Sequence, residues 1–215
     1  MTVDVKICGL REAEHVDAAV NAGAALTGYV FFPKSPRNVS ISEAGALTAR
    51  VPVGVRKVAL VVDADDDLLR AIVDGAGVDT LQLHGHETPE RVAVVRDTFD
   101  LTVMKALPIA DQADVEAARS YQDVSDMLLF DAKPPKGATR PGGNAMTFDW
   151  TLLKNTKWSV PWMLAGGLDA SNVAAALRIS GAGMVDVSSA VEDDQGRKDV
   201  AKIREFIAAA HAVQT

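Results

Sequence analysis

Val5-Lys6-Ile7-Cys8-Gly9 lies near the start of the chain as a short β-branched run closed by a glycine, and seven similar runs follow it. Apolar residues recur at helical spacing after each run, so we expect strand and helix to alternate along the whole chain. The eight expected strands span residues 5–8, 27–32, 56–62, 80–84, 102–106, 127–131, 162–165 and 184–188. This alternation requires parallel strands joined by right-handed crossovers. Eight repeats favour a closed (β/α)₈ TIM barrel over an open doubly wound sheet.

The expected helices have start and stop signals of known type. Capping or acidic side chains favour helix starts at Ser42, in the acidic run 63–67, at Thr88 and at residues 170–172. Glycines favour helix ends at residues 23, 75–77 and 181–183. No change in composition marks a linker, so we expect residues 1–215 to form one catalytic domain.

Composition and charge narrow the class of protein. The chain has 215 residues, of which 48% are hydrophobic and 24% charged, as in ordinary soluble globular proteins. Its 22 basic and 29 acidic side chains give a net charge of −7. Such a chain has no overall attraction for nucleic acid or an anionic membrane, and we expect neither as a partner. A negatively charged ligand would need a local cluster of donors.

Cys8 is the single cysteine of the chain. One thiol excludes an internal disulfide and a zinc site built on several thiolates, and it points to a reducing compartment. The first residues carry charges and lack a secretory apolar segment, and no apolar run reaches the roughly 18 residues of a membrane span. We therefore expect a cytoplasmic protein.

Polar side chains gather at the carboxyl ends of the expected strands, where barrels of this type carry their chemistry. Because side chains alternate along a strand, Lys6 and Cys8 should both point inward. The same parity places further polar groups inside the barrel, namely Gln82, His84, Asp131, Asp186 and Ser188. A thiol and a carboxylate across one barrel mouth would suit a general base and a general acid. Alternatively, Cys8 is a small buried apolar residue and Asp131 a loop or capping carboxylate.

Two strand ends suggest an anion site. Gly166-Gly167 follows the seventh expected strand, and Ser188-Ser189 ends the eighth. Backbone amides after these two strands form the recurrent phosphate site of the fold. Arg37, in a proline-stiffened loop after the second strand, is either a carboxylate clamp or a solvated side chain. The long segment 132–147 is rich in proline, glycine and lysine, and loops of this length are usually functional.

We expect no metal ion. His84 and His86 are two residues apart, but no carboxylate or thiolate spacing supports a shared site. The acidic run 63–67 lacks the EF-hand glycine and terminal glutamate, so helix-start charge explains it better.

Several strings of the sequence together resemble the phosphoribosylanthranilate isomerase family. They are Val5-Lys6-Ile7-Cys8-Gly9, Gly28-Tyr29-Val30-Phe31-Phe32-Pro33-Lys34-Ser35-Pro36-Arg37, Gln82-Leu83-His84-Gly85, Phe148-Asp149-Trp150, Gly166-Gly167-Leu168 and Val185-Asp186-Val187-Ser188-Ser189. They occur in the family's order over nearly the whole chain. The resemblance implies a TIM barrel and a cofactor-free Amadori rearrangement of N-(5′-phosphoribosyl)anthranilate in tryptophan biosynthesis.

The resemblance also implies roles for single residues. Cys8 matches the family's general base, Asp131 its general acid and Arg37 its binder of the anthranilate carboxylate. The remaining substrate contacts expected on this basis are His84, Gly143, Gly166, Gly167, Ser188, Ser189 and Ala190. The base role calls for a nearby positive charge such as Lys6 to favour the thiolate, and we expect Lys6 to pair with Asp186.

The sequence departs from the family pattern at two places. Gly142-Gly143-Asn144-Ala145-Met146 replaces the usual Gly-Gly-(Ser/Thr)-Gly-Lys, and Ala190 stands where the family has glycine. If Ala190 needs a positive φ, we expect strain of about 1–2 kcal/mol and weaker phosphate binding. Other phosphate-binding barrel enzymes are an alternative, although they should show a metal cluster or a catalytic lysine and glutamate. A further alternative is an inactive or altered-specificity phosphate-binding barrel. We expect an active enzyme, and the sequence does not distinguish a monomer from a homodimer.

Overall fold

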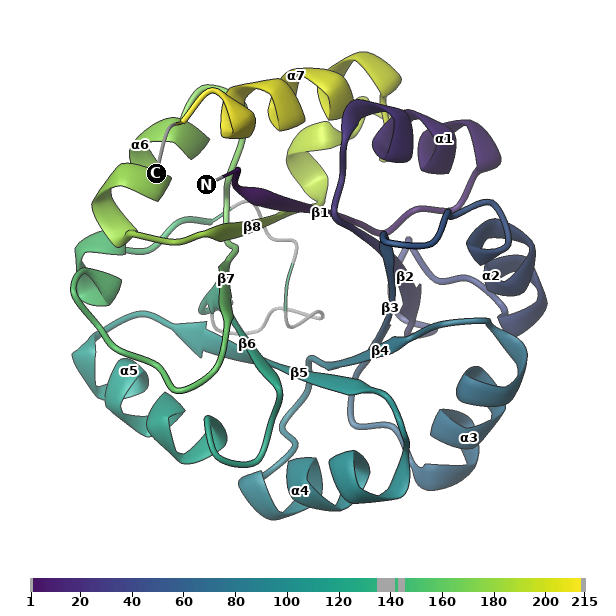
Figure 1. Ribbon diagram of the computed structural model, residues 1–215, viewed down its shortest axis with the longest axis horizontal. Coiled ribbons are helices and arrows are strands. Elements are labelled where there is room, and N and C mark those ends of the chain that lie inside the picture. Colours follow the sequence, from purple (N-terminus) through teal and green to yellow (C-terminus); the bar gives the residue numbers. More distant parts are fainter. Residues whose placement is uncertain (1, 135–141, 143–145, 214–215) are drawn as a thin grey trace.

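Eight parallel strands close into a barrel in the computed structural model, and helices surround it (Figure 1). The structure describes residues 2–134, 142 and 146–213. The strands are β1 (Asp4–Cys8), β2 (Leu26–Phe31), β3 (Arg56–Val61), β4 (Thr80–Leu83), β5 (Thr102–Ile109), β6 (Met127–Ala132), β7 (Trp162–Leu164) and β8 (Met184–Val187). Each strand pairs with the next, and β1 pairs with β8 to complete the ring. The predicted TIM barrel is confirmed.

The helices lie outside the strand ring. The α-helices are α1 (Ala13–Ala22), α2 (Ile41–Thr48), α3 (Asp66–Gly75), α4 (Pro89–Thr98), α5 (Gln112–Ala118), α6 (Val173–Ser180) and α7 (Val200–His211). The described residues also form short 3₁₀ helices, namely η1 (Arg119–Tyr121), η2 (Trp150–Leu153) and η3 (Ser189–Val191). The expectation of an α-helix after every strand is wrong for the described part of the β6–β7 connection, which holds only η2. Asn155 follows η2 with a left-handed φ of 62°, a conformation that does not continue a helix.

Local signals explain most helix ends. Thr88 caps α4 with its side chain, and Gly23 ends α1 with a φ of 96°. The start of α2 differs from the prediction, because Ser40 rather than Ser42 is the N-cap. The Ser40 hydroxyl accepts from the backbone N–H of Glu43, and the Glu43 carboxylate accepts from the backbone N–H of Ser40. This reciprocal capping box satisfies two helix-end donors, which a cap at Ser42 would leave open.

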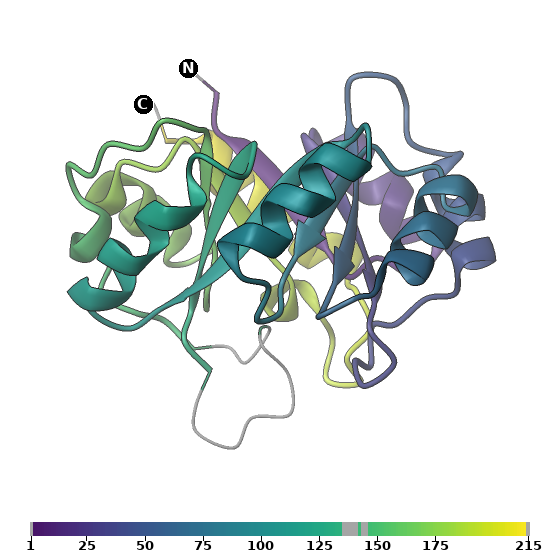
Figure 2. The same ribbon diagram turned by 90° about the horizontal axis from the view of Figure 1, so that it is seen from below.

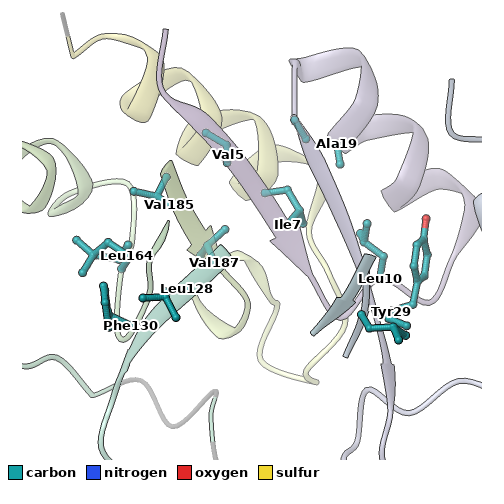
Figure 3. Packing of buried hydrophobic residues seen from close by; sticks show 14 of the residues in the cluster. Val5, Ile7, Leu10, Ala19, Tyr29, Leu128, Phe130, Leu164, Val185 and Val187 are labelled. Atoms are coloured by element: carbon teal, nitrogen blue, oxygen red, sulfur yellow. The ribbon is translucent and has the colours of Figure 1, made fainter. Parts of the chain in front are cut away.

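The hydrophobic core has an outer layer and a barrel interior. Figure 3 shows Val5 and Ile7 of β1 beside Val187 of β8, on the barrel face that the helices cover. A separate cluster fills the inside of the barrel and consists of Leu26, Val58, Met104, Ala106, Met127, Leu129, Met163 and Ala165. The barrel is therefore a packed core, and ligands have access only at its ends.

The loops that follow the strands gather at one rim. In the side view of Figure 2 the strands run from the upper rim to the lower rim, where these loops lie. β1 and β6 lie on different sides of the ring (Figure 1), so their carboxyl ends lie across this mouth from one another. Among the described residues, no helix combines the length and apolar character needed to cross a membrane.

Candidate active site at the carboxyl ends of the strands

Cys8 is the last residue of β1, and its thiol lines a cavity at the barrel mouth. Only 4% of the residue is exposed, and it contacts a small apolar cluster with Val30 and Leu60. Phe32 and Val62 pack against this cluster from the rim. The predicted inward orientation of Cys8 is confirmed, and the thiol combines burial with access to the cavity.

Lys6 lies on the same inner face, one step deeper in the barrel. Its Nζ donates a 2.9 Å hydrogen bond to Oδ1 of Asp186, which stands opposite it in the register of β1 and β8. The predicted pairing is confirmed. Burial alone would lower the pKa of Lys6, but the charges of Asp186 and Cys8 raise it overall, so the ammonium is stable.

The same surroundings shift the pKa of the Cys8 thiol. Burial raises the pKa of Cys8 above its ordinary value, and Asp186 adds to this effect, whereas the Lys6 charge lowers it. Lys6 therefore acts in the expected direction, but desolvation outweighs it.

Asp131 approaches the mouth from β6 and is 8% exposed. Its Oδ1 accepts a 2.8 Å hydrogen bond from the backbone N–H of Ala132, and its Oδ2 lies 3.3 Å from Nε2 of His84. Nδ1 of His84 lies 3.0 Å from Nε2 of Gln82. In the tautomer in which Nδ1 accepts from the Gln82 amide, the ring proton is on Nε2 and is directed at Asp131. The prediction that Gln82, His84 and Asp131 face inward is confirmed.

Gly142 closes over this pair. A Cβ at this position would lie 2.6 Å from Oδ2 of Asp131 and 2.9 Å from Nε2 of His84. Both distances are shorter than real contacts, so only glycine allows the backbone to approach Asp131 this closely.

The cavity has two lobes of different character. The apolar lobe is lined by Cys8, Val30, Phe32, Leu60, Val62 and Arg37. The polar lobe is lined by Gly166, Gly167, Leu168, Val187, Ser188 and Ser189. Asp131, Asp186 and Ser188 line both lobes. A ligand with an apolar ring at one end and an anionic group at the other would therefore have its middle beside Asp131.

Arg37 is not solvated, which rules out the alternative interpretation of its loop. It is 7% exposed, and its Nε and Nη2 donate to the two carboxylate oxygens of Glu192 at 2.6 and 2.8 Å. Glu192 also accepts a 2.7 Å hydrogen bond from Nζ of Lys198. Sequence reasoning assigned no role to Glu192 or Lys198, because Arg37 and Glu192 are 155 residues apart and their pairing leaves no local pattern.

The polar lobe presents backbone donors. Gly166 and Gly167 have φ of 87° and 61°, and a Cβ on Gly167 would lie 2.7 Å from the carbonyl oxygen of Met146. Within the described ranges, no group accepts a hydrogen bond from the backbone N–H of Gly167, Ser189 or Ala190. These N–H groups suit an anion.

Ala190 lies inside η3 and is not among the described non-glycine residues with positive φ, so the condition for strain there is not met. Gly143 lies outside the described residues. The His86 side chain is 93% exposed in the loop and contacts Asp63, away from His84.

Comparison with known proteins identifies the family. The model of the N-(5′-phosphoribosyl)anthranilate (PRA) isomerase family matches residues 5–209. The chain belongs to this isomerase family. An N-(5′-phosphoribosyl)anthranilate isomerase from Paramagnetospirillum magneticum is 55% identical over 210 residues, which cover 98% of each chain. One from Cereibacter sphaeroides is 53% identical over 205 residues, covering 95% of this chain and 97% of the relative.

Solved structures agree with this membership and with the fold. The phosphoribosyl anthranilate isomerase from Thermotoga maritima superposes with a TM-score of 0.87 at 31% identity, over 98% of this chain and 100% of the other. A phosphoribosyl anthranilate isomerase in complex with reduced 1-(o-carboxyphenylamino)-1-deoxyribulose 5-phosphate gives a TM-score of 0.83 at 29% identity, with the same coverage. The enzyme is thus an isomerase built on the barrel that its sequence predicts.

Proposed function

We propose that the enzyme converts N-(5′-phosphoribosyl)anthranilate into 1-(o-carboxyphenylamino)-1-deoxyribulose 5-phosphate, in tryptophan biosynthesis, with Cys8 as general base and Asp131 as general acid. Family membership supports the reaction. The observation that carries the two roles is that one cavity is lined by both the Cys8 thiol, from β1, and the Asp131 carboxyl, from β6.

The reaction requires one acid, one base and no cofactor. Asp131, in its protonated form, gives a proton to the ribose ring oxygen as the bond from C1′ to that oxygen breaks. The lone pair of the anthranilate nitrogen forms the C1′=N bond of a protonated Schiff base. The Cys8 thiolate then removes the proton from C2′, and its electrons form the C1′=C2′ bond of an enolamine. The electron pair of the former C1′=N bond returns to the nitrogen. In the final tautomerisation C1′ gains a proton from the Cys8 thiol and the C2′ hydroxyl loses one to the Asp131 carboxylate, which forms the carbonyl and restores both groups. Each transfer group is typically worth about 10²–10⁴ in rate.

The two lobes match the two ends of the substrate. The apolar walls formed by Val30, Phe32 and Leu60 suit the anthranilate ring, with Arg37 available for its carboxylate. The backbone N–H groups of Gly167 and Ser189 suit the phosphate. With the two ends bound in this way, we expect the ribose at the junction of the lobes, beside Asp131. The negatively charged substrate is then bound by local donors, despite a net charge of −7.

A crystal structure with reduced 1-(o-carboxyphenylamino)-1-deoxyribulose 5-phosphate tests this placement. We expect the phosphate against Gly167 and Ser189, the carboxylate within hydrogen-bond distance of Arg37, and C2′ between Cys8 and Asp131. A phosphate bound outside the polar lobe, or C2′ out of reach of the thiol, would overturn the assignment.

We further propose that the enzyme works in the cytoplasm, as a monomer or a homodimer, without nucleic acid or membrane as a partner. A single cysteine and the acidic net charge support this proposal. Sedimentation equilibrium of the purified protein would distinguish the two oligomeric states.

A further inference from the structure

Arg37 has two edges that can each hold a carboxylate through two parallel hydrogen bonds. One edge consists of Nε and Nη2, and the other of Nη1 and Nη2. Glu192 occupies the first edge, at 2.6 Å from Nε and 2.8 Å from Nη2. Among the described residues, no acceptor binds Nη1. The second edge therefore remains for another carboxylate.

The guanidinium is fixed from two directions. Glu192 holds the Nε/Nη2 edge. The aliphatic part of the Arg37 side chain lies so close to Gly9 that a Cβ on Gly9 would be 2.5 Å from Cδ of Arg37. Gly9 has a φ of 80°, a conformation that also favours glycine. Arg37 is thus held in one position before a substrate arrives, which reduces the entropy lost on binding.

Glu192 is in turn neutralised by a buried lysine. The side chains of Glu192 and Lys198 are 9% and 2% exposed, and Nζ of Lys198 donates to Oε1 of Glu192 at 2.7 Å. The same Nζ donates to the backbone oxygen of Ser188 at 2.8 Å, at the end of β8. With Lys198 protonated, Arg37, Glu192 and Lys198 carry +1, −1 and +1, which sum to +1. Without Lys198, the sum would be zero and a substrate carboxylate would gain little attraction.

We propose that Glu192 and Lys198 are positioning residues that hold Arg37 with its Nη1/Nη2 edge toward the apolar lobe, so that the anthranilate carboxylate binds as the second carboxylate on one guanidinium. This inference rests on the proposed role of Arg37. It adds two residues that act through Arg37 and confer preference for substrates with an ortho-carboxylate.

Substitutions at Glu192 and Lys198 test the proposal. We expect Glu192→Gln and Lys198→Met each to raise KM about tenfold or more while kcat changes less than about threefold, because ground-state and transition-state binding weaken together. Lys198→Met removes the net positive charge. Glu192→Gln increases that charge, and we expect the lost orientation of Arg37 to outweigh the increase. Lys202 provides a matched control, since its Nζ donates to the backbone oxygen of Glu192 at 2.7 Å and not to the carboxylate. Lys202→Met should leave KM within about twofold of the parent. Lys198→Arg should recover most of the loss, because it keeps the charge.

A double-mutant cycle separates positioning from general structural damage. Arg37→Ala should raise KM strongly, and adding Glu192→Gln to that variant should change KM by less than about twofold. An equal further rise in the Arg37→Ala background, or an unchanged KM in both single variants, would overturn the inference. An unchanged KM in Arg37→Ala itself would instead refute the proposed role of Arg37.

Binding of inhibitors gives a second readout that mere destabilisation would not produce. The reduced product analogue should lose about tenfold in affinity for Glu192→Gln, whereas the same compound without its ortho-carboxylate should bind parent and variant equally. Equal losses for both compounds would contradict the proposal. If Glu192→Gln fails to fold, Lys198→Arg and Lys198→Met with the same two compounds decide the question by the same criteria.

Discussion

Replacing Lys6 with methionine should destabilise the barrel strongly. The Lys6 side chain is fully buried and that of Asp186 is 10% exposed, and their 2.9 Å contact joins β1 to β8, where the ring closes. Lys6→Met leaves a buried carboxylate without its partner. Breaking a buried pair in this way typically costs about 3–5 kcal/mol. For a domain of about 200 residues, each kcal/mol lowers Tm by about 2–4 °C, so we expect a fall of about 6–20 °C.

The assay is thermal unfolding followed by circular dichroism at pH 7, with two comparison variants. Lys6→Met/Asp186→Asn removes both charges and should recover most of the lost stability, because the cost arises from the unpaired charge. Lys57→Met breaks the pair of Lys57 and Asp79, whose side chains are 29% and 41% exposed, and should cost less than about 1 kcal/mol. A loss below about 1 kcal/mol in Lys6→Met, or no recovery in the double variant, would refute the reasoning.

Lys6→Met should also change the pKa of the Cys8 thiol. Because Lys6 lowers the pKa of Cys8, Lys6→Met should raise that pKa further above its ordinary value. The ultraviolet absorbance of the thiolate measures this directly, since Cys8 is the single cysteine. A lower thiol pKa in Lys6→Met would contradict the electrostatic account.

Two other predictions follow from the ends of the substrate. Gly167→Ala should raise KM at least about tenfold, since φ of Gly167 is 61° and a Cβ there would lie 2.7 Å from the Met146 carbonyl oxygen. Ala190→Gly should change KM less than about twofold, because Ala190 needs no positive φ. Steady-state kinetics checks both, and a large effect of Ala190→Gly would contradict the description of the polar lobe. Burial lowers the pKa of Lys198 to about 8 against the raising effect of Glu192, so its charge is present below that pH and lost above it. KM should therefore rise as pH increases through about 8. The ionisable groups that face Lys198 are Glu192, Arg37 and Cys8. Lys198→Arg should abolish the rise in KM, and a rise that persists in this variant would assign it to Cys8 or another group.

The architecture was predictable because it depends on repeated local patterns. β-branched runs, Thr88 as a helix cap and Gly23 as a helix end each depend on a few neighbouring residues. Strand parity extended this reasoning to side chains and correctly turned Lys6 and Cys8 inward.

Contacts between distant residues were harder to predict. The Lys6–Asp186 pair was accessible because barrel closure makes β1 and β8 neighbours. The Arg37–Glu192 pair was not accessible, since Glu192 follows η3 in a segment that has no repeating apolar pattern. The start of α2 was also mispredicted, because Ser42 was chosen as the cap, whereas Ser40 forms the reciprocal bonds with Glu43.

The central claim is that Cys8 and Asp131 transfer protons across one cavity, and the kcat values of Cys8→Ala and Asp131→Asn test it most directly. Thermal unfolding should first show that both variants keep the fold. We predict that each lowers kcat for N-(5′-phosphoribosyl)anthranilate by at least about a hundredfold, because each removes one proton-transfer group. Near-normal turnover in either variant would remove that residue from the mechanism.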